Sequence, residues 1–402
     1  MPFVIYVLGL GIFAQGTSEF MLSGLLPDIS RDLGVSLSSA GLLVSAFAIG
    51  MLVGAPLLAM ATLKLPRRAT LVGFQATFVA GHIAAALVPD FTFLLLMRFL
   101  TAMAYAGFWA LAAVTAMAAV EPGRRARAIS VITSGLSIST IVGVPAGTLL
   151  AQHAGWQAAF WAVAALTVLS AVPLLTAVPG ERDTSARQLR LRTEVQSLAV
   201  PRLWIAYGTT ALVTGSFIGI FSYLGALLED VTGMSETLVP LVLGLYGVGA
   251  LIGLTIGGRT ADRAPHGTIL AAMGTVTVVA AALAWSASSP WVAVPLAVLL
   301  GLSGFLANPA VQAQVFNILG ETRTLGSALN TAAFNLGIAV APWLSGLVID
   351  AGHGLAATAW VGAAFAVAAI FSTLLGRHQA RRHQRAGSHL AQPPATQPAE
   401  SR

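Results

Sequence analysis

One acidic residue lies deep inside an apolar segment of the chain. Of the 15 Asp and Glu residues, only Glu19 falls well within such a segment, which begins near residue 3. If this segment spans a membrane, an ionised carboxylate at its centre costs about 2.5–3.5 kcal/mol unless it is paired or hydrated. We therefore expect Glu19 to be protonated for part of a working cycle, as a proton-coupling site requires.

Arg98 is the basic residue that falls inside a predicted membrane segment. Glu19 and Arg98 both lie within about two helical turns of the same membrane surface, so their predicted depths are similar. Two interpretations are open for this pair: a role in proton coupling or substrate contact, or a structural ion pair. Loss of either charge would leave the other unpaired in a medium of low dielectric, so loss of transport alone does not separate the two roles.

Polar and aromatic residues at helical spacing predict the walls of a binding site. A site for a small amphiphile needs apolar walls and a few polar groups that set its orientation. The candidates are Gln15, Tyr105, Trp109, Tyr207, Thr210, Thr214, Phe217, Phe221, Asn308, Gln312 and Asn330. Packing between helices is the alternative role for every aromatic residue among them.

The roles of three polar residues, Asn330, Asn335 and His82, are left open. Asn330 and Asn335 point about 140° apart on one helix, so at most one is expected to face the site. His82, in the third predicted span, is expected either to pack against a neighbour or to carry protons.

The composition requires a membrane environment for these residues. Apolar residues make up 56% of the chain and charged residues 9%, against roughly 45–50% and about 25% in soluble domains. Apolar stretches of about 20 residues, each long enough to cross a hydrocarbon core, recur along the sequence. The predicted fold is an all-α membrane protein with spans at 3–26, 38–60, 69–88, 92–119, 128–151, 156–178, 203–226, 238–258, 267–287, 291–317, 325–349 and 355–376.

The basic residues predict the orientation of these twelve spans. If the N-terminus is cytoplasmic, 19 of the 21 Lys and Arg residues fall in cytoplasmic segments, and only Arg31 and Arg98 fall elsewhere. Cytoplasmic loops of membrane proteins carry an excess of such residues, so both termini are predicted to be cytoplasmic. A multi-pass protein of the cell membrane is expected.

The chain divides into two related halves. Residues 1–178 and 203–376 each hold six predicted spans, 179–202 form a charged cytoplasmic linker, and 377–402 form a tail that is expected to be disordered. The segment from Gly54 to Pro66 recurs from Gly253 to Pro265, at an offset of 199. Repeated halves with a site at their interface are typical of transporters.

Several function classes are excluded or disfavoured. The chain has no Cys, so thiolate metal sites and cysteine nucleophiles are excluded. The single lysine, Lys64, follows Leu63, so a phosphate-binding loop with Gly-Lys-Ser/Thr is absent. No dense cluster of acids and histidines indicates an enzyme or a metal site. The formal charge of +6 is spread over short loops, which does not favour nucleic-acid binding.

Several motifs resemble those of the major facilitator superfamily. The loop after the eighth span reads Gly258-Arg259-Thr260-Ala261-Asp262-Arg263 and keeps that family's acidic and basic pair. Its first copy, Leu63-Lys64-Leu65-Pro66-Arg67-Arg68, has Leu63 where Asp is usual. Arg98 matches the family's fourth-span arginine, and Gly143, Pro145 and Gly147 match the glycine-proline motif of antiporters. The resemblance implies the major facilitator fold of two pseudo-symmetric six-helix halves.

A closer resemblance covers the first span and the residues after it. The runs Gly16-Thr17-Ser18-Glu19-Phe20, Gly24-Leu25-Leu26-Pro27 and Gly155–Trp161 resemble drug:proton antiporters, in particular the chloramphenicol exporters of actinomycetes. This resemblance implies export of a small amphiphilic drug in exchange for protons, by a monomer that uses the proton gradient and no cofactor. Export of a sugar, nucleoside or other metabolite, and a non-transporting membrane sensor, are the alternatives.

The motif residues have two possible roles each. Gly143 and Gly147 could form a hinge or allow close helix packing, and Pro145 is expected to introduce a kink. Asp262 and Arg263 could latch the cytoplasmic helix ends, although a loop ion pair usually contributes little.

Overall fold

The computed structural model describes residues 1–62, 65–178, 200–319 and 324–390. Within these residues it contains twelve helical segments that are long and apolar enough to cross a membrane, and helices account for nearly all of the regular structure. In an apolar medium every backbone polar group needs an internal partner, which favours uninterrupted helices over exposed loops. The predicted all-α fold with twelve spans is confirmed.

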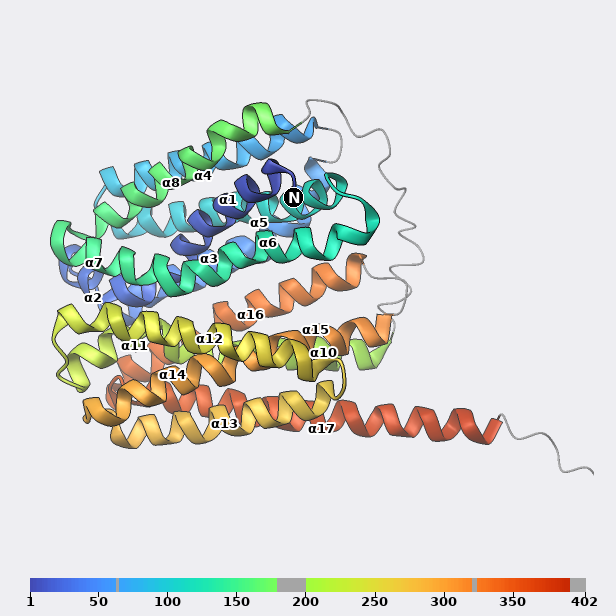
Figure 1. Cartoon of the computed structure of the whole chain (residues 1–402). Coiled ribbons are helices and arrows are strands. Elements are labelled where there is room, and N and C mark those ends of the chain that lie inside the picture. Colours follow the sequence, from blue (N-terminus) through green and yellow to red (C-terminus); the bar gives the residue numbers. More distant parts are fainter. Residues whose placement is uncertain (63–64, 179–199, 320–323, 391–402) are drawn as a thin grey trace, which may run out of the picture.

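The N-terminal half holds the first six spans (Figure 1). Its helices are α1 (Phe3–Phe20), α2 (Leu22–Leu33), α3 (Leu37–Ala61), α4 (Arg67–Leu87), α5 (Phe91–Ala118), α6 (Arg125–Ile138), α7 (Val144–Ala154) and α8 (Trp156–Ala177). A π-helical turn, Ser139–Gly143, joins α6 to α7 within the fifth span. The Asp90 side chain accepts a hydrogen bond of 2.7 Å from the Phe93 backbone N–H and thereby caps α5.

The C-terminal half holds the last six spans. Its helices are α10 (Pro201–Ser222), α11 (Leu224–Ala226), α12 (Val239–Ala261), α13 (Pro265–Ser286), α14 (Pro290–Leu306), α15 (Asn308–Leu319), α16 (Thr324–Val348) and α17 (Ala357–Leu390). Proline stands in the first turn of α10, α12, α13 and α14, where its missing N–H leaves no helical bond unmade.

The same close packing recurs in both halves. Gly54 of α3 lies against the backbone of Met103 in α5, and 199 residues later Gly253 of α12 lies against the backbone of Leu302 in α14. A side chain at either glycine would collide with the partner helix, so both pairs need a small residue. The first and fifth spans repeat in the same way at an offset of 202, because Gly135 lies against Gly9 and Gly337 lies against Ala211.

Two predicted boundaries are wrong. The first span, predicted to run to residue 26, is interrupted at Met21 between α1 and α2. The predicted tail from residue 377 is helical as far as Leu390, because α17 continues with helix-favouring Ala, Arg and Gln residues. Most of the predicted linker, 179–199, lies outside the described residues, and its last two positions belong to α10.

The two halves are held together toward the end of the bundle opposite the N-terminus, here called the far end (Figure 1, left). Arg31 of α2 binds Asp28 at 2.6 Å and lies 3.8 Å from Glu236 in the other half. The Ser38 hydroxyl donates to Asp350 at 2.5 Å, which is a second bond between the halves. The end that carries the N-terminus and the last turns of α17 is called the near end.

Close backbone contacts also join the halves at the far end. Gly225 of α11 lies against the Ser23 carbonyl of α2. Gly41 of α3 lies directly beneath the Tyr223 hydroxyl, which donates to the Pro342 carbonyl at 3.1 Å. The far end is therefore packed shut in this conformation.

Candidate functional site

A cavity of about 380 Å³ lies between the two halves, at mid-depth and toward the near end. Its volume is in the range of sites for drug-sized ligands. The residues that line it come from both halves: Glu19, Met51, Tyr105, Trp109, Thr133, Leu136, Ser137, Thr140, Thr210, Ala250, Leu251, Leu254, Phe305, Asn308, Pro309, Val311, Gln312, Asn330, Thr331, Phe334 and Asn335.

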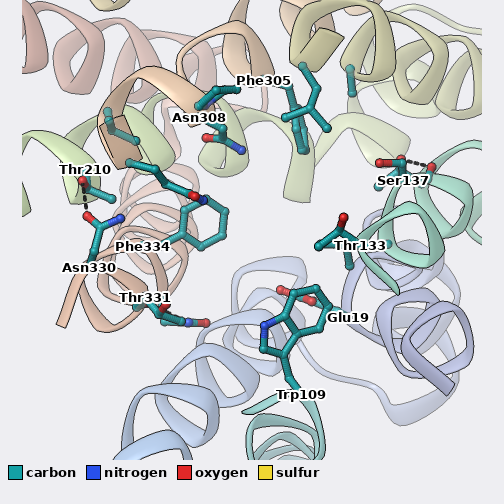
Figure 2. A pocket seen from close by; sticks show the side chains of 18 of the residues that line it. Glu19, Trp109, Thr133, Ser137, Thr210, Phe305, Asn308, Asn330, Thr331 and Phe334 are labelled. Carbon is teal, nitrogen blue, oxygen red and sulfur yellow. Dashed lines mark hydrogen bonds between the residues drawn. The ribbon is translucent and has the colours of Figure 1, made fainter. Parts of the chain in front are cut away.

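The N-terminal wall carries the carboxyl group. Glu19 and Trp109 both belong to this wall (Figure 2). The Tyr105 hydroxyl lies next to the Glu19 carboxyl, and the Tyr105 ring meets the Trp109 ring edge-on at 6.3 Å. Glu19 keeps some surface exposed to the cavity, whereas Tyr105 is buried. A proton or a ligand in the cavity can therefore reach this carboxyl.

Arg98 lies behind this wall and does not line the cavity. The Ser18 carbonyl and hydroxyl accept hydrogen bonds of 3.1 and 2.8 Å from its Nη1, and its guanidinium lies 4.2 Å above the Phe47 ring. No Glu19 oxygen lies within 4.0 Å of the guanidinium, so the expected contact ion pair is absent in this conformation. Residues 18 and 19 point about 100° apart on α1, which turns Ser18 toward Arg98 and Glu19 toward the cavity.

His82 belongs to the same buried group. Its Nε2 lies 2.7 Å from the Ser18 hydroxyl, its Nδ1 lies 2.9 Å from the Phe78 carbonyl, and its ring stacks on Phe78 at 4.2 Å. It is fully enclosed and does not line the cavity.

The C-terminal wall is rich in amide side chains, which lie across the cavity from Glu19 (Figure 2). Asn330 accepts a 2.7 Å hydrogen bond from the Thr210 hydroxyl, and Asn335 donates to the Thr331 carbonyl at 3.0 Å. Both asparagines line the cavity, so the expectation that at most one would do so is wrong. The cavity extends around two sides of α16. The side-chain oxygen Oδ1 of Asn308 is buried and without a hydrogen-bond partner.

Both walls contain a helix irregularity at the cavity. The π-helical turn Ser139–Gly143 contains the cavity residue Thr140 of the fifth span. The tenth span is interrupted at Ala307, between α14 and α15. Such irregularities expose backbone groups and are frequent at functional sites. Three cavity residues of the fifth span, Thr133, Ser137 and Thr140, were not predicted, although their spacing of four and three residues places them on one face of the helix.

Four predicted site residues lie away from the cavity. Gln15 is completely buried inside the N-terminal half. The Tyr207 hydroxyl donates to the Gly326 carbonyl at 3.0 Å, and the Thr214 hydroxyl donates to the Thr210 carbonyl of its own helix at 2.9 Å. Phe217 packs against Phe305, with ring centroids 5.1 Å apart. The expectation that these four residues line the cavity is wrong for this conformation, because their faces of α1 and α10 turn toward neighbouring helices.

The predicted aromatic Phe221 lies on the far side of Glu19. It stacks on Tyr246 at 4.3 Å and meets Phe20 edge-on at 6.4 Å. With Glu19 and Ser222 it lines a chamber of about 10 Å³ between the cavity and the far end. Glu19 thus borders both spaces.

The glycine-proline motif mediates packing. Gly143 lies against Thr17 of α1, and a side-chain carbon at Gly147 would lie 3.2 Å from Met21. Pro145 packs on Gly244 of α12 and so touches the other half. A π-helical turn lies just before Pro145, where a kink is predicted. By contrast, the side chains of Asp262 and Arg263 are exposed, and neither forms an ion pair with a described residue.

A group of charged residues lies at the far end, outside the spans. Burial raises the pKa of Glu229 to about 7, and the neighbouring carboxylates of Asp28, Glu236 and Asp230 add to the rise, whereas Arg31 opposes it. Burial also raises the pKa of Asp28, while Arg31 lowers it. The closed far end therefore holds a carboxyl that titrates near neutral pH.

The model for the Major Facilitator Superfamily matches residues 8–324 and 233–399. The chain belongs to this superfamily. It is 37% identical over 383 residues to a chloramphenicol resistance protein of Streptomyces lividans, with 93% of this chain and 97% of that protein covered. It is 34% identical to the inner membrane transport protein YdhP of Escherichia coli K12, with 89% and 91% covered.

A solved structure shares the fold. It is a bacterial homologue of the human lysosomal transporter Spinster in an inward-facing, unoccupied conformation, and its TM-score is 0.79 with 93% of this chain and 96% of that chain covered. Its sequence identity of 17% supports the fold alone. The chain is therefore a multi-pass membrane transporter of the major facilitator type.

Proposed function

We propose that this transporter exports a small amphiphilic drug, chloramphenicol or a close chemical relative, in exchange for protons. The observation that carries the proposal is the position of Glu19, a carboxyl that borders a drug-sized cavity with apolar walls and amide groups opposite. The similarity to a chloramphenicol resistance protein supports this cargo. The transporter works as a monomer, and the proton gradient supplies the energy without a cofactor.

The proposed orientation follows the basic loops and places both termini in the cytoplasm. The far end is then extracellular and closed, so the structure represents an inward-facing state. The chloramphenicol-sized cargo enters the cavity from the cytoplasm or inner leaflet while Glu19 releases its proton. The halves then rock about the cavity, and a proton from outside neutralises Glu19 as the cargo leaves.

The membrane potential assists this cycle. Exchange of a neutral cargo for one proton moves a net charge across the membrane, which is worth about 2.3 kcal/mol per 100 mV. An uncoupler therefore removes both the chemical and the electrical driving force.

The test measures chloramphenicol accumulation in a susceptible host that expresses the wild-type chain or Glu19→Gln at equal membrane levels. Glu121→Gln, which changes an exposed carboxyl away from the cavity, is the matched control. We expect low accumulation with the wild type and the control, and high accumulation with Glu19→Gln or an uncoupler. Accumulation unaffected by the wild type contradicts the assignment of this cargo.

A second candidate cargo is a more polar metabolite such as a nucleoside or sugar. The observation that favours it is the set of amides on the C-terminal wall, which is larger than expected because both Asn330 and Asn335 line the cavity. Competition separates the two cargos: excess unlabelled nucleoside or sugar reduces labelled chloramphenicol export only if the amide wall accepts such molecules.

A further inference from the structure

The buried group behind Glu19 has a single consistent hydrogen-bond direction. A backbone carbonyl only accepts, so the Nδ1 of His82, at 2.9 Å from the Phe78 carbonyl, carries the ring proton. In the neutral ring, Nε2 is then an acceptor. The Ser18 hydroxyl, at 2.7 Å, must donate to it. This assignment follows from the hydrogen-bond network.

The direction of the Ser18 hydroxyl decides what Arg98 meets. Because its proton points to His82, its oxygen lone pairs are free to accept from Arg98 Nη1 at 2.8 Å. The Ser18 carbonyl accepts from the same nitrogen at 3.1 Å, and the Phe47 ring covers the guanidinium at 4.2 Å. Ser18, His82 and Arg98 are all buried, and in such a low-dielectric environment each hydrogen bond is electrostatically stronger than in water.

We propose that His82 and Ser18 are positioning residues that hold the Arg98 guanidinium at a fixed place behind Glu19 and thereby set the acidity of the coupling carboxyl. This proposal rests on the proposed proton-coupling role of Glu19. The Nε and Nη2 of Arg98 have no partner, so the two bonds from Nη1 to Ser18 are its hydrogen-bonding anchor.

Few other groups compete for this role. The charged or titratable groups that act on Glu19 are Arg98 and Tyr105, both on α5. The residues that α3 and α10 contribute to the small chamber beside Glu19 carry no titratable group; they are Val44, Phe47, Ile218, Phe221 and Ser222. Tyr246 of α12 lies behind Phe221, with which it stacks. His82 of α4 acts on Glu19 through Ser18 and Arg98.

The test measures how the Glu19 carboxyl titrates in the purified protein in lipid, without any cargo. The protonated-carboxyl infrared band that is present in the wild type and absent from Glu19→Gln reports its midpoint. Arg98→Met removes the guanidinium charge, so the shift of the Glu19 titration midpoint in this variant is the largest that loss of Arg98 positioning can cause. Ser18→Ala and His82→Leu are expected to displace this midpoint in the same sense, by about half a pH unit or more.

Two comparisons separate positioning from packing. His82→Gln offers an acceptor oxygen near the place of Nε2, so the Glu19 titration midpoint in this variant should equal the wild-type value. The double variant Ser18→Ala/His82→Leu should be displaced no further than Ser18→Ala alone, because both changes break one chain of bonds. If His82→Leu does not fold, Ser18→Ala provides the same test with a smaller truncation.

Three results would overturn the proposal. The first is a Glu19 titration midpoint in Ser18→Ala that equals the wild-type value. The second is an equal shift of this midpoint in His82→Gln and His82→Leu, and the third is an unshifted midpoint in Arg98→Met. The absence of any titrating Glu19 band is a different result, because it contradicts the proton-coupling role itself along with the positioning role.

Discussion

The two halves share one backbone plan but differ in their interior chemistry. At the offset of 202, Glu19 corresponds to Phe221, and at the offset of 199, Arg98 corresponds to Ala297 and His82 to Ala281. The group that could handle protons is therefore present in one half only. Packing repeats because both halves need the same close helix contacts.

The amide side chains that line the cavity, by contrast, belong to the C-terminal half. Trp109 corresponds to Asn308 at the offset of 199, and Thr133 corresponds to Asn335 at the offset of 202. The C-terminal wall presents amides where the N-terminal wall presents an indole and a hydroxyl. If the proposed function holds, this difference predicts a division of work in which one half binds protons and the other orients the polar part of the cargo.

The largest expected effect comes from moving the carboxyl between the halves. The double variant Glu19→Gln/Phe221→Glu should lose proton-driven export by about tenfold or more, like Glu19→Gln alone, since an interaction required for coupling is removed. Position 221 stacks on Tyr246 and has no arginine or histidine partner. Uptake into inverted vesicles measures this loss. Recovery of half of the wild-type rate would contradict the division.

A smaller effect is expected from blocking closure of the far end. Gly41→Ala places a methyl group against the Tyr223 hydroxyl, and such overpacking costs about 1–3 kcal/mol in the closed state. Because the chain has no cysteine, a single Ser222→Cys reports opening by its labelling rate. We expect faster labelling from the far end in Gly41→Ala and slower export.

Gly73→Ala is the matched control, because nothing lies within 4 Å of the added carbon. Tyr223→Phe in the Gly41→Ala background removes the hydroxyl but leaves the ring carbon Cζ in the way, so it should restore slow labelling only in part. Fast labelling in the control or slow labelling in Gly41→Ala would show that this contact does not govern closure.

The amide wall should affect cargo affinity more than proton coupling. Asn308→Leu and Gln312→Leu each remove a polar group from the cavity, and we expect KM for export to rise about three- to tenfold, as for loss of one hydrogen bond. The number of protons moved per cargo should not change. A change in this ratio with KM unchanged would place coupling in the C-terminal half.

The smallest effect concerns external pH. The pKa of Glu229 is raised to about 7 in the closed state, so protonation favours closure: this contribution is present below about pH 7 and is lost as pH rises through that value. Labelling of Ser222→Cys should therefore slow by about twofold between pH 8 and pH 6, a small change because Glu229 is partly solvated. Glu229→Gln should show no such dependence, and an unchanged slope in that variant would exclude Glu229.

The sequence predicted the number of spans, the two halves and the position of Glu19, because an apolar chain leaves few places for charge. It also predicted the repeat from Gly54 and Gly253, and the structure shows a close helix contact at both glycines. It did not predict that Ser18 rather than Glu19 binds Arg98, since neighbouring residues on a helix face different partners.

The cavity walls were predicted less well. Tyr105, Trp109, Asn308, Gln312 and Asn330 line the cavity as expected. Gln15, Tyr207, Thr214 and Phe217 do not, because the rotation of α1 and α10 depends on which helices cover them. Periodicity gives the faces of a helix but not which face meets the other half.

Proton movement in proteoliposomes tests the central claim most directly. An outwardly directed chloramphenicol gradient, with no initial pH difference and an enclosed pH-sensitive dye, should acidify the lumen in liposomes that contain the wild-type protein. Glu19→Gln should give no acidification, whereas Gln312→Leu should acidify at a reduced rate. Chloramphenicol efflux through the wild type without proton entry, or full acidification with Glu19→Gln, would contradict proton exchange through Glu19.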